Sequence, residues 1–73
     1  RYTVSGRKCE YGIAGVDTNI FPFGTKLYIT GYGYAVAADR GAAISGTTVD
    51  LYFDHRIQCM TWGAQSVDIY VLK

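Results

Sequence analysis

The sequence has little charge, few cysteines, one histidine and no long apolar runs, and each shortage excludes a class of protein. Only 18% of its residues are charged and the net charge is +1, so it lacks the basic block typical of nucleic-acid binding. No apolar run approaches the length of a membrane span. Two cysteines and one histidine are too few ligands at metal spacing, so we expect neither a metal nor another cofactor.

The residues that are present favour a small β domain. Of the 73 residues, 49% are hydrophobic and nine are glycine, and the β-branched and aromatic residues point to strands and turns. A chain of this length buries only about 60% of its unfolded surface, which allows one domain at most. It begins at Arg1 with no signal-like apolar stretch. We therefore expect a single domain over residues 1–73, trimmed at its N-terminus.

The two cysteines allow one disulfide at most. Cys59 falls in a predicted helix, which favours a buried thiol over a bond to Cys9. Isolated pairs outside dense disulfide frameworks are also rare. The Cys9–Cys59 bond remains the less favoured of the two alternatives.

The pattern of apolar residues and glycines predicts six short strands and one helix. The expected strands lie near Thr3-Val4 and over residues 12–16, 26–29, 34–38, 49–53 and 67–72. The helix is expected over 55–62, with Asp54 as its N-cap and Gly63 as its stop. So many strands in so small a chain favour a closed barrel, which leaves fewer exposed edges than an open sheet.

Three aspartates stand out as candidate catalytic acids. Asp17 and Asp39 each follow an apolar run, and Asp50 lies inside one. Burial raises the pKa of a carboxyl group, and a second carboxylate nearby raises it further, so such a group can act as a general acid. A glycine-bearing loop between Asp39 and Asp50 can bring the two together. The alternative is that an aspartate only caps a turn, which we expect for Asp54 and, as an outward strand residue, for Asp68.

The order and spacing of several motifs resemble a known family. Residues 15–29 contain G-V-D followed by I-F-P-F-G-T-K-L-Y-I, residues 31–39 read G-Y-G-Y-A-V-A-A-D, and residues 49–53 read V-D-L-Y-F. Trp62-Gly63 and residues 67–72 complete the pattern. Together they resemble the 3D domain, named for three aspartates and found in bacterial cell-wall enzymes. They are also similar to the barrel of the membrane-bound lytic transglycosylase A type.

This resemblance, which covers residues 3 to 73, carries expectations for fold and function. It implies an all-β, six-stranded double-psi β-barrel with one short helix, located outside the cytoplasm as a secreted or wall-associated module. It implies a lytic transglycosylase that cleaves the β-1,4 bond between N-acetylmuramic acid and N-acetylglucosamine in peptidoglycan glycan strands and leaves a 1,6-anhydro product. The three aspartates of the family match Asp17, Asp39 and Asp50. In this resemblance, Asp50 matches the family's catalytic acid/base, and Asp39 matches the aspartate that supports this acid/base.

The chain also departs from the family pattern. Residues 40–46 read R-G-A-A-I-S-G where the family has T-G-G-A-I-K-G. We expect substrate contacts at Gly41 and Ala42 in this loop and at Tyr32 in a glycine turn, although the methyl group of Ala42 narrows the approach of a sugar. The family's first strand is missing, so we expect a barrel that lacks or swaps this strand, with a homodimer as a hypothesis.

Three functions therefore remain open from the sequence. The first is a peptidoglycan-cleaving enzyme with Asp50 as its acid. The second is a non-catalytic module that binds cell-wall glycan and has lost turnover through its altered loop. The third is a scaffold without a ligand.

Overall fold

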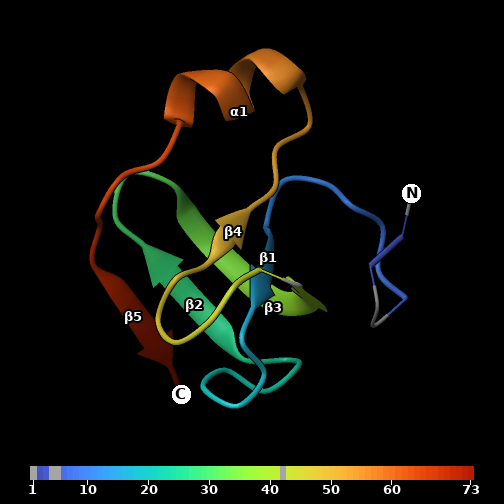
Figure 1. Cartoon of the computed structure of the whole chain (residues 1–73), viewed down its shortest axis with the longest axis vertical. Helices are drawn as coiled ribbons and strands as arrows, with labels where there is room; N and C mark the ends of the chain where they lie inside the picture. Colours follow the sequence, from blue (N-terminus) through green and yellow to red (C-terminus); the bar gives the residue numbers. More distant parts are fainter. Residues whose placement is uncertain (1, 4–5, 42) are drawn as a thin grey trace.

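The computed structural model describes residues 2–3, 6–41 and 43–73 and shows a mostly β chain with one short helix (Figure 1). In chain order, the elements are β1 (Ile13–Val16), β2 (Lys26–Ile29), β3 (Gly33–Arg40), β4 (Asp50–Leu51), α1 (Arg56–Trp62) and β5 (Ile69–Leu72). The strand expected over 26–29 is confirmed residue for residue. The strand expected over 49–53 shortens to two residues.

The strands form one mixed sheet in the order β4-β1-β3-β2-β5. β1 and β3 run parallel, and the other neighbours are antiparallel. β4 and β5 are the end strands and do not pair with each other, so the sheet formed by the described residues is open rather than a closed six-stranded barrel. The strand expected near Thr3 is represented by one bridge between Tyr2 and Lys8, and Val4 lies outside the described residues.

The core lies on one face of this sheet and takes alternate residues from its strands. In β2, Leu27 and Ile29 are fully buried while Lys26 and Tyr28 are exposed, as the alternation in the sequence predicts. β1 is buried at all four positions because it lies between β3 and β4. The core cluster comprises Ala14, Val16, Phe21, Leu27, Ile29, Tyr32, Ala35, Ala37 and Leu51.

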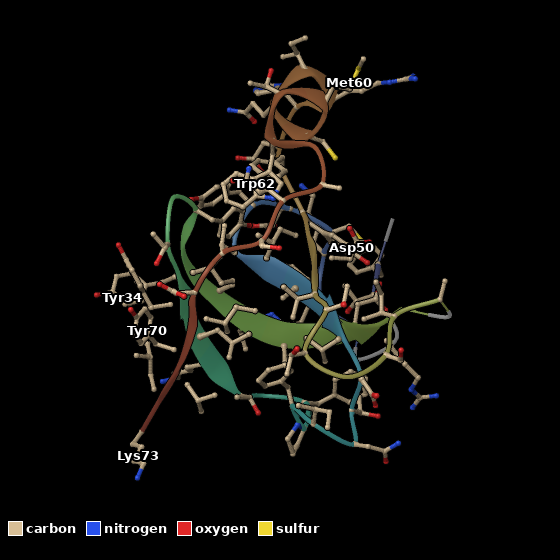
Figure 2. All side chains as sticks on the ribbon, turned by 60° about the vertical axis from the view of Figure 1, so that its left-hand side comes forward. Tyr34, Asp50, Met60, Trp62, Tyr70 and Lys73 are labelled. Atoms are coloured by element: carbon tan, nitrogen blue, oxygen red, sulfur yellow. The ribbon has the colours of Figure 1, made fainter. Side chains whose placement is uncertain are left out.

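Helix α1 stands at one end of the molecule and packs through Trp62 against the core (Figures 1 and 2). Its N-cap is His55, so the expectation that Asp54 caps the helix is wrong. Asp54 instead accepts the backbone N–H of Tyr11 through Oδ1 at 3.0 Å. The expected stop is confirmed: Gly63 follows the helix with a φ of 62°, a conformation that favours glycine.

The two cysteines are free thiols in this structure. Cys9 is half-buried, but Cys59 is exposed, so the expected burial of Cys59 is wrong. The physical reason is that α1 buries none of its residues completely. No helix in the described part of the chain has the length and apolar character needed to cross a membrane.

Candidate active site

Asp39 and Asp50 flank Gly15 in the sheet. Gly15 of β1 pairs with Asp39 of β3 on one side and with Asp50 of β4 on the other. Residues directly opposite each other share a face, so both carboxylates belong to one face, with Cα atoms about 9–10 Å apart across two strand spacings. A register shift after Ala14 creates this arrangement because it brings Asp39, rather than Ala38, opposite Gly15.

The Tyr52 hydroxyl holds the buried member of this pair. It donates a hydrogen bond to Asp39 Oδ2, while Asp39 Oδ1 accepts the Arg40 N–H at 2.9 Å. Gly15 lies between the two acids, where an added Cβ would meet the Tyr52 hydroxyl and Asp50 Cβ at the ordinary contact distance of 3.5 Å. Burial raises the pKa of Tyr52 far above its usual value, and Asp39 and Asp50 raise it further. Tyr52 therefore remains a proton donor to Asp39 at neutral pH.

Asp50 borders a hollow of about 290 Å³ beside α1. The other residues that line the hollow are Cys9, Leu51, Tyr52, Phe53, His55, Arg56 and Cys59. Asp39 is only 6% exposed, whereas Asp50 is exposed. Figure 2 places Asp50 at the side of the sheet below α1. Of the two acids, Asp50 is the one that a large substrate can reach.

Asp17 has a different place in the structure. Its Oδ2 accepts the backbone N–H of Gly46 at 2.9 Å, and its Oδ1 accepts that of Asn19 at 3.0 Å. These bonds, the one from Gly46 first, hold the pKa of Asp17 below its usual value. Asp17 is not among the residues that line the Asp50 hollow. It ties the end of β1 to the loop that leads from Asp39 to Asp50.

The residues expected to contact a sugar lie in three different settings. Tyr32 is 7% exposed and belongs to the core, where its hydroxyl donates to the Tyr52 carbonyl at 2.6 Å. Burial raises the pKa of Tyr32 to about 12. The hydrogen bond to Tyr52 fixes the segment that follows Asp50. Because the Tyr32 ring is buried, little of its surface is accessible to a sugar. Gly41 is half-buried against the Ile44 side chain, and Ala42 lies outside the described residues.

The sequence analysis missed Tyr52 as the partner of Asp39. Tyr52 follows Asp50 by two residues, and residues at this spacing in an extended chain share a face. That spacing is the signal that could have identified it. Cys9 and Cys59, which complete the hollow from distant parts of the chain, carry no such local signal.

The groups held between the strands are two carboxyl groups and a tyrosine hydroxyl, and the hollow beside them adds Cys9, His55, Arg56 and Cys59. Within the described ranges, no three histidine, cysteine, aspartate or glutamate side chains gather closely enough to hold a metal ion. The arrangement offers one exposed carboxyl group for proton transfer and one buried carboxylate fixed beside it. The burial that would raise the pKa of a carboxyl group is seen at Asp39 but not at the exposed Asp50, so a proton-transfer role for Asp50 depends on its neighbours and on the bound substrate.

Comparison with known sequences assigns the chain to a family. The family model of the 3D domain matches residues 12–73, which include all five strands and the helix. The chain belongs to the 3D domain family. This 3D domain is 42% identical over 61 residues to YabE of Bacillus subtilis (strain 168), whose name calls it a cell wall shaping protein. It is 40% identical over 61 residues to YocH of the same organism, named a cell wall-binding protein.

The two relatives are much longer than the chain they match. Each match covers 84% of this chain but only 15% of YabE and 21% of YocH. The 3D domain is thus a small part of either relative.

Proposed function

We propose that this 3D domain is a lytic transglycosylase module that cleaves peptidoglycan glycan strands outside the cytoplasm, secreted or associated with the cell wall. The observation that carries the proposal is the pair Asp39 and Asp50 on either side of Gly15, with one acid buried and fixed and the other exposed. Membership of the 3D family and the names of both relatives support a cell-wall substrate.

In the proposed reaction, Asp50 is the acid and then the base. Its carboxyl group gives a proton to the glycosidic oxygen as the bond from that oxygen to C1 of N-acetylmuramic acid breaks. The resulting carboxylate takes the proton of the C6 hydroxyl of the same sugar, and the C6 oxygen bonds to C1. The products are a 1,6-anhydro end and a free 4-hydroxyl group, and Asp50 regains its proton. Neither water nor an enzyme nucleophile takes part, unlike in hydrolases with two working carboxylates.

Asp39 and Asp17 are positioning residues in this proposal. A carboxylate disfavours a second negative charge near it, so we assign Asp39 the role of keeping the proton on Asp50 until a sugar oxygen accepts it. Tyr52 supports this role by fixing Asp39. Asp17 acts at greater distance, because its bond to Gly46 holds the loop that joins the strands of the other two acids.

The open sheet leaves a place for the sixth strand of the expected double-psi barrel. β5 is an end strand, and its Tyr70 and Val71 are each 54% exposed. An unpaired edge of this kind accepts another strand through backbone hydrogen bonds. We propose that a second copy of the chain supplies that strand in a homodimer.

A wall-binding module without turnover is the second candidate. The name of YocH favours it, as does the exposure of Asp50, because an exposed carboxyl group is not shielded from water. In the altered loop, the Arg40 guanidinium carbon lies 6.0 Å from the centre of the Phe23 ring. In this candidate the fold and its acids are retained, but the sugar bond is not broken.

Purified peptidoglycan sacculi separate these functions. The wild type should bind sacculi and release anhydro-muropeptides, and Asp50→Asn should bind but release none. Binding without release by both proteins would support the wall-binding module instead. If the wild type is shown by circular dichroism to be folded but neither binds sacculi nor releases fragments, the result would support a scaffold without a ligand. Asp68→Asn is the matched control, since Asp68 is exposed and remote from the Asp50 hollow.

A further inference from the structure

A second hollow lies against α1 and has no part in the acid chemistry. It measures about 390 Å³, and the rings of Tyr11, Phe53 and Trp62 form much of its wall. The aliphatic side chain of Ile57 and the polar side chains of Gln58, Thr61 and Gln65 complete it. No charged side chain lines this groove among the described residues. We call it the aromatic groove.

The rings of the aromatic groove are held in place by their neighbours. Tyr11 stacks on the buried Tyr32 with centroids 4.4 Å apart and an interplanar angle of 21°. Trp62 meets the Phe53 ring at 6.1 Å and lies over Gly31, where an added Cβ would come within 3.4 Å of the indole. A ligand would therefore meet ring faces that are already ordered, which lowers the entropy cost of binding.

The polar side chains of the groove keep hydrogen-bonding capacity for a ligand. Gln58 uses its carbonyl oxygen for the His55 N–H at 3.1 Å, and its amide group carries two N–H donors. Gln65 donates to the Trp62 carbonyl at 2.9 Å, and its own carbonyl oxygen is an acceptor. Thr61 donates to the Ile57 carbonyl at 2.8 Å, and its oxygen has lone pairs.

We infer that the aromatic groove binds N-acetylhexosamine residues of a glycan strand. An N-acetylhexosamine is uncharged, has an apolar ring face suited to aromatic side chains, and carries an acetamido group that pairs with side-chain amides. The uncharged lining matches such a ligand and offers no counter-ion to a charged one. Phe53 lines both this groove and the Asp50 hollow, so a bound sugar would lie next to the proposed cleavage site. The inference rests on the proposed glycan substrate but not on turnover.

The single tryptophan of the chain provides the test, because it lies in the groove. Titration with chitotetraose, an N-acetylglucosamine oligomer, should give a saturable change in Trp62 emission. Calorimetry on the same samples should give the same affinity. Cellotetraose, which lacks the acetamido groups, should bind more weakly. Gln58→Ala should weaken chitotetraose binding about fivefold, which corresponds to one lost hydrogen bond.

Asp68→Asn is the matched control, because Asp68 is exposed and lines neither hollow, and it should bind chitotetraose like the wild type. The readout is binding and not release from sacculi, so failure of the proposed reaction would leave it unchanged. If calorimetry detects no chitotetraose binding, or if Gln58→Ala binds like the wild type, the inference is overturned.

Discussion

Replacement of Tyr52 by phenylalanine tests the contact on which the geometry of the site depends. The change removes the hydroxyl that donates to Asp39 while leaving the ring, so the buried carboxylate loses one of its donors. A hydrogen bond to a charged group is worth about 1.5–3 kcal/mol, and we expect a loss of about 2 kcal/mol of unfolding free energy. In a domain of 60–100 residues that corresponds to a fall in Tm of roughly 8–16 °C.

The assay is thermal unfolding followed by circular dichroism, with Tyr34→Phe as the matched control. Tyr34 is 68% exposed and lies on the same sheet, so its hydroxyl should matter little. Surface substitutions usually change stability by less than about 0.5 kcal/mol, or roughly 2–4 °C here. If Tyr52→Phe melts within that margin of the control, the bond to Asp39 does not hold the site together.

Three further predictions concern other parts of the molecule. Gly15→Ala should raise the unfolding free energy, measured by urea titration, by about 0.5–1 kcal/mol, because alanine reduces the conformational entropy of the unfolded chain. The added Cβ would meet its neighbours at ordinary distances of 3.5–3.7 Å. A loss of stability would mean that the space beside Asp50 is too tight for a methyl group. The lowered pKa of Asp17 contributes stability that is present above the ordinary pKa of 3.8 and is lost as the pH falls through the folded-state value. Asp17→Asn should therefore lose less unfolding free energy than the wild type as the pH falls. If the two proteins give parallel curves of unfolding free energy against pH, this prediction is refuted. If two copies pair through β5, light scattering over a concentration series should show the mass of a dimer, whereas the mass of a monomer at every concentration would exclude this pairing.

The parts of the fold that follow local rules were predictable from the sequence. The alternation of Lys26 to Ile29 identified β2 and its buried face, and Gly63 identified the end of α1. The family membership followed from motifs of fixed order and spacing. These features depend on neighbouring residues, and a local pattern therefore determines them.

The parts that depend on register or distant segments were not predictable. The shift after Ala14 that places Asp39 opposite Gly15 is a property of two paired strands and leaves no mark in either one. Asp54 resembled a helix cap, but a contact with the distant Tyr11 determines its role. Closure of the barrel failed as an expectation because the described strands number five and each end strand, β4 and β5, pairs on one side only.

The most direct test of the proposed reaction is the origin of the oxygen in the cleaved ends. Sacculi are digested in water enriched in heavy oxygen, and the released fragments are analysed by mass spectrometry. Because the sugar's own C6 hydroxyl attacks C1, we expect 1,6-anhydro ends without solvent oxygen, formed by the wild type and absent with Asp50→Asn. Reducing ends that carry solvent oxygen, or anhydro ends formed equally well by Asp50→Asn, would contradict the role assigned to this carboxyl group.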